Sequence, residues 1–109
     1  MIKVGDKIPS VGISSVLAGE TSSIEADRLV AGKKVVLFAL PGAFTPTCSA
    51  SHLPGFIVKA DEILAKGVDM IACLSVNDAF VMKAWAEMQN AEQITMIADG
   101  GAGLTTAMG

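Results

Sequence analysis

The stretch KVVLFALPGAFTPTCS, residues 34–49, decides the fold. Residues 34–40 begin with Lys34 and continue as an apolar run rich in β-formers, which predicts a strand buried on both faces, as in a parallel sheet. A Pro-Gly pair ends that strand. Thr45 then fits the N-cap of a helix and Pro46 its first position, so Cys48 falls in the first helical turn. The stretch therefore predicts a strand, a turn and a helix start, with one thiol at the junction.

The position of Cys48 favours ionisation of its thiol. Several backbone N–H groups are unpaired in the first turn of a helix, and the helix dipole is positive at that end. Both features favour the thiolate, which is the reactive form of cysteine. The neighbours of Cys48 are not typical of a core, so we interpret it as a reactive thiol. Cys73 lies inside the apolar run MIACLSV, residues 70–76, where a small buried side chain is the simpler interpretation.

Three apolar runs, at residues 34–40, 70–76 and 94–98, alternate with helical patterns. The order strand–helix–strand–helix–strand predicts parallel strands joined by right-handed crossovers, and so a single α/β sandwich domain. Functional sites in such sheets lie at the carboxyl ends of strands. Cys48 follows the carboxyl end of the first of these strands.

Capping and breaking residues predict the helix boundaries. The first thirty residues indicate a strand-and-turn lead-in, with a short helix capped by Ser22 or Ser23 and ending near Leu29. Because Pro54 is disfavoured inside a helix, we expect a kink or a restart near His52-Leu53, with a helix that continues over residues 55–66. Asn77 or Asp78 caps a further helix that extends to about Gln89. The predicted inner faces are Phe56, Ala60, Ile63 and Leu64 on the first of these two long helices, and Val81, Trp85 and Met88 on the second.

Composition and charge narrow the class of function. A chain of 109 residues with 51% apolar and 17% charged residues suits one folded domain. A net charge of -3 without a basic face argues against a nucleic-acid partner. No apolar stretch approaches a membrane span and no signal peptide is evident, so we expect a cytoplasmic protein with reduced cysteines. One histidine and two well-separated cysteines do not make a metal site, and no cofactor motif is present.

Three neighbours of Cys48 have open interpretations. His52, the only histidine, lies one helical turn beyond Cys48. As a general base it would indicate a cysteine hydrolase, but no orienting Asn or Asp is evident, so a supporting hydrogen bond is preferred. The Thr45 hydroxyl either caps the helix or lies beside the sulfur. Pro41 either ends the strand or also shields the thiol from water.

The runs PGAFTPTCS, residues 41–49, and HLPGF, residues 52–56, closely resemble the peroxiredoxins of the type-5, or plant type-II, group. Pro41, Thr45 and Cys48 match the peroxiredoxin signature Pro-x-x-x-Thr-x-x-Cys. The later run ACLSVNDAFV, residues 72–81, also resembles that group, and the similarity covers essentially the whole chain.

The resemblance implies a thioredoxin-like fold and the reduction of hydrogen peroxide and alkyl hydroperoxides. Cys48 would be the peroxidatic cysteine that cycles through sulfenic acid, Thr45 the hydroxyl that orients the peroxide, and Pro41 the shield. The backbone N–H groups of Thr47 and Cys48 would help to hold the peroxide oxygens. Glutathione, glutaredoxin or thioredoxin would be the reductant. A homodimer across the face that bears the active site is also implied.

The chain departs from the family pattern after Gly109, where the family continues with two strands, a helix and an essential arginine. The only arginine here, Arg28, does not match that residue. We therefore expect residues 1–109 to be a C-terminally truncated domain whose strand 34–40 has an unpaired edge. The alternative function is a catalytically impaired fragment or a non-enzymatic interaction module. A thioredoxin-type disulfide reductase is disfavoured because Cys-x-x-Cys is absent.

Overall fold

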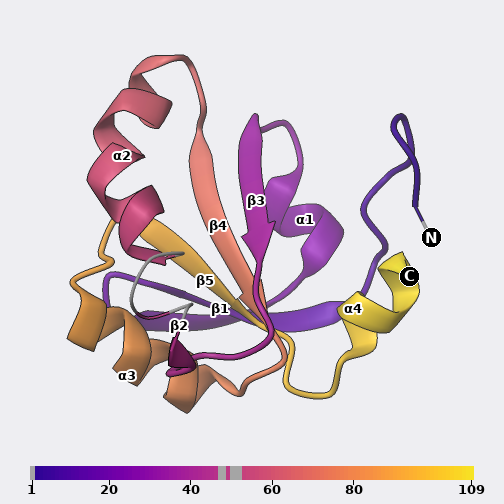
Figure 1. Ribbon diagram of the computed structural model, residues 1–109. Coiled ribbons are helices and arrows are strands. Elements are labelled where there is room, and N and C mark those ends of the chain that lie inside the picture. Colours follow the sequence, from indigo (N-terminus) through magenta and orange to yellow (C-terminus); the bar gives the residue numbers. More distant parts are fainter. Residues whose placement is uncertain (1, 47–48, 50–52) are drawn as a thin grey trace.

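A computed structural model describes residues 2–46, 49 and 53–109 (Figure 1). The elements in chain order are β1 (Gly12–Leu17), β2 (Glu20–Glu25), α1 (Ala26–Val30), β3 (Val35–Ala39), α2 (Leu53–Ala65), β4 (Met70–Ser75), α3 (Ala79–Gln89), β5 (Ile94–Ala98) and α4 (Gly103–Met108). The ends of the chain lie close together, and the Ile2 N–H donates to the Met108 carbonyl over 2.9 Å.

The strands form one mixed sheet with the order β2-β1-β5-β4-β3. β3, β4 and β5 are parallel, as their alternation with helices predicts, whereas β1 is antiparallel to both β2 and β5. The prediction of an α/β sandwich with a mostly parallel centre is therefore confirmed. The parallel register pairs Phe38 with Cys73 and Ala39 with Leu74, so β3 and β4 end together at one edge of the sheet.

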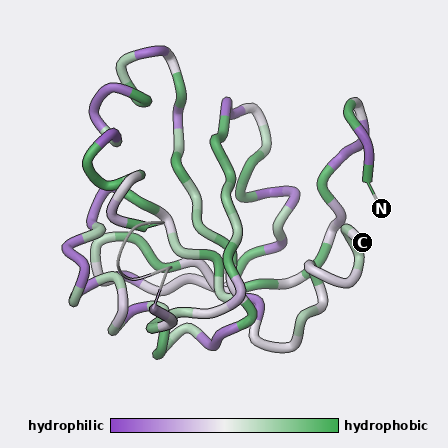
Figure 2. Tube along the Cα trace, viewed as in Figure 1, coloured by the Kyte–Doolittle hydropathy of each residue, from purple (hydrophilic) through white to green (hydrophobic). Residues whose placement is uncertain are grey.

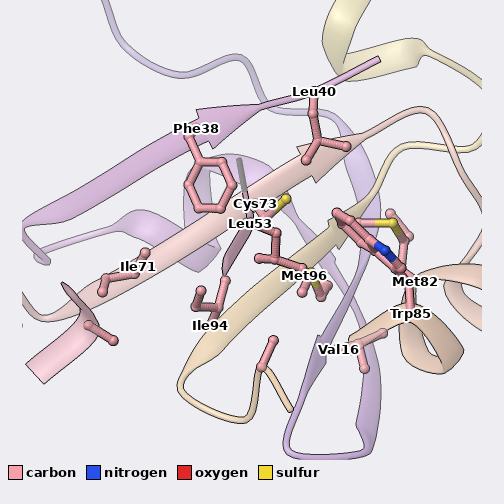
Figure 3. Close-up of a cluster of buried hydrophobic side chains, with 13 residues drawn as sticks. Val16, Phe38, Leu40, Leu53, Ile71, Cys73, Met82, Trp85, Ile94 and Met96 are labelled. Carbon is pink, nitrogen blue, oxygen red and sulfur yellow. The ribbon is translucent and has the colours of Figure 1, made fainter. Parts of the chain in front are cut away.

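Helices cover both faces of the sheet, because successive residues of a strand point to opposite sides. On one face, Ile71 and Cys73 of β4 pack with Leu53 of α2 and with Met82 and Trp85 of α3 (Figure 3). On the other face, the alternate β4 residues belong to a second cluster that includes side chains of α1 and α4. The Cα trace in Figure 2 is correspondingly apolar along much of β3 and β4.

β3 is less buried than the sequence predicts. Val35, Val36 and Leu37 are half-buried and Ala39 is exposed, whereas every residue of β5 is buried. The reason is topological: β3 lies at the end of the sheet and pairs only with β4 among the described residues. The prediction of a strand buried on both faces is wrong here, and β3 lies at the edge of the sheet among the described residues, as predicted.

The lead-in folds differently from the prediction. Ser22 and Ser23 lie in β2, which forms a hairpin with β1, so neither caps a helix. α1 begins after Glu25, at a cap without a side-chain hydrogen bond. β2 is largely exposed and polar, so it lacks the apolar alternation by which a half-buried strand is recognised.

The two long helices follow the predicted pattern with one correction. α2 is described from Leu53 to Ala65 and includes Pro54, whereas the kink or restart predicted near His52-Leu53 falls partly outside the described residues and stays a prediction. Asp78 caps α3, since its side chain accepts a hydrogen bond from the Val81 N–H over 2.8 Å. The predicted α3 stripe is wrong at Met88, which is 69% exposed, while Met82 is fully buried beside Trp85. The predicted inner face of α2 is confirmed: Ala60 is buried, and Phe56, Ile63 and Leu64 pack against the core.

Candidate active site

The candidate site lies where β3 and β4 end. Residues 40–46 follow β3 and residues 76–78 follow β4, and because the two strands are parallel neighbours these loops meet at one edge of the sheet. The predicted site residues Pro41 and Thr45 belong to the first loop. Thr47, Cys48 and His52 lie outside the described residues, so their predicted roles stay predictions.

Two hydrogen bonds fix the turn that precedes Cys48. The Thr45 hydroxyl donates to the Gly42 carbonyl oxygen over 2.8 Å. The Ala43 N–H donates to the Oδ1 atom of Asn77 over 2.8 Å, which joins the two loops across the sheet edge. Oδ1 also accepts a bond of 2.6 Å from the Ser75 hydroxyl, and Ser75 is 2% exposed. Asn77 therefore anchors the turn to the buried end of β4.

The turn contains an unusual backbone conformation at Phe44. Its φ angle is +63°, in the left-handed region that residues other than glycine seldom adopt. The Phe44 side chain is 47% exposed, and its ring centroid lies 6.4 Å from that of Trp85 at an interplanar angle of 50°. Surrounding contacts must hold such a conformation, and it is a common feature of functional loops. Pro41, at the start of the turn, is exposed.

Thr45 begins a helical segment, as predicted. Its carbonyl oxygen accepts a hydrogen bond from the Ser49 N–H over 2.9 Å, which is the spacing of an α-helical bond, and Pro46 is helical. Ser49 is held from its other side, because its hydroxyl oxygen accepts from the indole Nε1 of Trp85 over 3.1 Å. Residues on both sides of Cys48 are thus bonded to α3 or to the loop that leads into it.

Cys73 occupies the position expected of a core residue. Its side chain is 0% exposed and belongs to the cluster of Figure 3, beside Phe38 and Leu53. The interpretation of Cys73 as a small buried side chain is confirmed.

Asp99 is a buried carboxylate at the carboxyl end of β5. It accepts hydrogen bonds from the Leu104 N–H at 3.1 Å, the Thr105 N–H at 2.7 Å and the Thr105 hydroxyl at 2.6 Å. Burial raises the pKa of Asp99, but the hydrogen bonds from Thr105, Leu104 and Gly103 together outweigh it and leave that pKa below its ordinary value. The carboxylate fixes the start of α4.

Sequence reasoning considered Asn77 only as a helix cap and missed its bond to the turn. The available signal was a polar residue directly after a buried parallel strand, at the edge where sites form.

Arg28 is exposed on α1, which packs on the opposite face of the sheet from α2 and α3. Among the described residues, no group of three or more His, Cys, Asp or Glu could hold a metal ion. No helix in this part of the chain is long and apolar enough to cross a membrane.

Known proteins similar in sequence to this chain belong to one family. The profile of the Redoxin family matches residues 3–109. Peroxiredoxin-2E-2, chloroplastic, of Oryza sativa subsp. japonica is 54% identical over 112 residues, covering 99% of this chain and 50% of the relative. Peroxiredoxin-2D of Arabidopsis thaliana is 48% identical over 110 residues, covering 99% of this chain and 68% of that protein.

Solved structures similar to this chain also include peroxiredoxins. The crystal structure of reduced Prx3 from Vibrio vulnificus in complex with H₂O₂ is 57% identical to this chain, with a TM-score of 0.93 and coverage of 99% of this chain and 68% of that one. Peroxiredoxin 5 from Alvinella pompejana is 36% identical, with a TM-score of 0.86 and coverage of 99% and 69%. The chain thus spans about half the length of its chloroplastic rice relative and about two thirds of the others.

Proposed function

Because this chain belongs to the redoxin family and, within it, to the peroxiredoxins, we propose that it reduces hydrogen peroxide or alkyl hydroperoxides through Cys48. The observation that carries the proposal is the turn directly before Cys48. It lies at the carboxyl edge of a parallel sheet, and Asn77 holds it from the next strand. Thr45, the residue that matches the peroxide-orienting hydroxyl, is part of that turn.

The proposed reaction is a two-electron oxidation of sulfur. The Cys48 thiolate attacks the terminal peroxide oxygen, so an S–O bond forms as the O–O bond breaks. The leaving hydroxide or alkoxide takes a proton and departs as water or alcohol. Cys48 is left as a sulfenic acid, which condenses with an external thiol and releases water. A second thiol then reduces the mixed disulfide.

The chain's own residues have distinct proposed roles. The Thr45 hydroxyl donates its hydrogen bond to the Gly42 carbonyl, so its oxygen can accept a hydrogen bond from the peroxide. The N–H groups of Thr47 and Cys48 hold the oxygens on which charge develops. Pro41 shields the thiol, and His52 supports it with a hydrogen bond. Glutathione, glutaredoxin or thioredoxin supplies the external thiol.

A homodimer across the site is part of the proposal. Phe44, Val76 and Phe80 are exposed by 47%, 42% and 86%, and they lie in or beside the two loops that Asn77 joins. Exposed apolar side chains that gather at the carboxyl ends of the strands in this way are typical of an interface between proteins. The cytoplasmic location expected from the sequence stays a prediction, since the names of the relatives include chloroplastic proteins and others without a stated compartment.

One observation favours the alternative, which is a catalytically impaired fragment or a non-enzymatic interaction module. The only arginine in the sequence lies on α1, on the opposite face of the sheet from α2 and α3. Losing one preorganised donor to transition-state charge costs about 100- to 1000-fold in rate in other enzymes. A peroxidase without such a donor beside Cys48 would therefore be slow.

The test is the rate at which Cys48 reacts with hydrogen peroxide, followed by stopped-flow mixing and by dimedone trapping of the sulfenic acid. The proposal expects Cys48 to react faster than free cysteine at the same pH, and Cys48→Ser to abolish the trapped adduct. Cys73→Ala is the matched control and retains the adduct. A rate equal to that of free cysteine would overturn the enzymatic function and favour the module.

A further inference from the structure

The Gly42–Ala43 peptide group is hydrogen-bonded at both of its ends. Its N–H, from Ala43, donates to the Asn77 Oδ1 atom over 2.8 Å. Its carbonyl, from Gly42, accepts from the Thr45 hydroxyl over 2.8 Å. A peptide group is planar, so fixing its N–H direction also fixes the direction of its carbonyl oxygen. The Asn77 side chain and the Thr45 hydroxyl therefore act on the same rigid unit.

We propose that Asn77 is a positioning residue for the peroxide reaction, which sets the orientation of the Thr45 hydroxyl through the Gly42–Ala43 peptide. This inference rests on the proposed function of Cys48. A chain of three hydrogen bonds runs from the Ser75 hydroxyl to Asn77 Oδ1, from the Ala43 N–H to the same oxygen, and from the Thr45 hydroxyl to the Gly42 carbonyl. The Gly42–Ala43 peptide donates at its N–H and accepts at its carbonyl, so these two bonds polarise and strengthen one another.

The orientation of the Asn77 amide follows from its partners. A backbone N–H can only donate, so the Asn77 atom facing Ala43 must be the oxygen. The Ser75 hydroxyl adds a second bond to that oxygen from a buried position on β4. One end of the chain of bonds is thus anchored in the rigid sheet, while the other end is the hydroxyl proposed to contact the peroxide.

The backbone conformation of Phe44 explains why the turn needs a tether, by which we mean the hydrogen bond from the Ala43 N–H to Asn77 Oδ1. The left-handed Phe44 backbone, with φ at +63°, lies between the two bonded residues Ala43 and Thr45 and disfavours the turn when it is unsupported. Without the Asn77 bond, Ala43 loses the hydrogen bond that connects it to the loop after β4, and the nearest bond to β4 is the one from the Leu40 N–H to the Leu74 carbonyl. The Thr45 hydroxyl then samples more than one direction, and a hydroxyl misplaced by about 1 Å can cost up to 100-fold in rate.

The experiment compares Asn77→Ala with wild type by two reactions of the same thiol. Both are measured above the thiol pKa, where the rates no longer depend on pH. Reaction with hydrogen peroxide needs the Thr45 hydroxyl, whereas alkylation by iodoacetamide needs only the thiolate. We expect N77A to slow the peroxide reaction about 10-fold and to leave alkylation within about 2-fold of wild type, in line with loss of one hydrogen bond. Equal slowing of both reactions would overturn the inference.

A double-mutant cycle with Thr45→Val tests the route of action. If Asn77 acts through Thr45, N77A slows the peroxide reaction in wild type but has no further effect in the T45V background. Fully additive effects would overturn the inference. Asp78→Ala is the matched control, because it removes the α3 cap one residue away without touching the tether. D78A is expected to lower the thermal midpoint of unfolding. It should leave unchanged the ratio between the rate of Cys48 with hydrogen peroxide and its rate with iodoacetamide.

A readout independent of catalysis separates this inference from the proposed function. Hydrogen exchange at the Ala43 amide is expected to become about 10-fold faster in N77A, with the β4 amides unchanged. If wild-type Cys48 reacts with peroxide no faster than free cysteine, the proposed function fails and the role in the peroxide reaction fails with it. If the wild type is fast but the Ala43 amide and the peroxide rate are the same in N77A, only the inference is overturned.

Asn77→Asp decides the matter if N77A does not fold. A carboxylate oxygen can accept both hydrogen bonds, so Ala43 protection and the peroxide rate above the thiol pKa are expected to stay within about 3-fold of wild type. Loss of Ala43 protection in a folded N77D chain would overturn the inference.

Discussion

The indole nitrogen of Trp85 lies 3.1 Å from the hydroxyl oxygen of Ser49, so α3 bonds directly to the residue that follows Cys48. Trp85 is 0% exposed, and most of its ring packs in the core of Figure 3. The same α3 begins directly after Asn77 and Asp78. One helix and the loop that leads into it thus hold the chain on both sides of the proposed thiol.

The Trp85–Ser49 bond predicts a measurable cost for its loss. Ser49→Ala leaves a buried indole N–H without its acceptor, which is expected to lower the free energy of unfolding by about 1–3 kcal/mol in urea titrations. Ser49→Thr keeps a hydroxyl and serves as the control. A double cycle with Trp85→Phe should give a coupling energy clearly different from zero. Unchanged stability in S49A would contradict this prediction.

Asp99 predicts an acid-sensitive fold. Its pKa is below the ordinary value of 3.8 in the folded chain, so the carboxylate contributes stability that is fully present above about pH 3.8 and is lost as pH falls through the lower folded pKa. Asp99→Asn presents an N–H₂ group to one of the N–H donors at the start of α4. We expect Asp99→Asn to lower the free energy of unfolding at neutral pH and to make that free energy depend less steeply on pH in the acid range. The same dependence on pH in the two proteins would refute the assignment.

The two cysteines are expected to react very differently with Ellman's reagent. Cys73 is 0% exposed, so only Cys48 should react promptly in the native chain, and the second thiol should appear after denaturation. Cys48→Ser is expected to remove the prompt phase. Cys73→Ala should keep it, while leaving a small cavity that costs about 1 kcal/mol of stability. Two prompt thiols in the native chain would contradict the burial of Cys73.

The edge of β3 predicts self-association at high concentration. β3 pairs only with β4 among the described residues, and its sequence VVLFA carries no charge to discourage a further strand. Ala39→Lys places a charge at an exposed position of that strand. It is expected to reduce higher oligomers in light scattering while leaving the thermal midpoint nearly unchanged. Ala31→Lys, an exposed site outside the sheet, is the control. Oligomers that persist unchanged in A39K would point to another surface.

Several elements could be predicted because their signals are local. β5 has the predicted bounds, since a run of apolar residues ends at a glycine-rich turn. The Asp78 cap depends on neighbouring backbone groups alone. The prediction failed at β2, whose exposed polar residues carry no burial pattern, and at Met88, which is exposed, whereas Met82 faces the core instead.

The amino-acid sequence by itself determined the order of strands and helices from β3 to β5, the parallel centre of the sheet and the place of Cys48 after β3, because periodicity and capping act over a few residues. The tertiary structure alone decided that Asn77 bonds to Ala43 across 34 positions and Trp85 to Ser49 across 36. These bonds exist because the strand order puts β3 beside β4, and because α3 packs against β5 and β1 on the face of the sheet that also holds α2. No local pattern encodes which loops the folded sheet brings together.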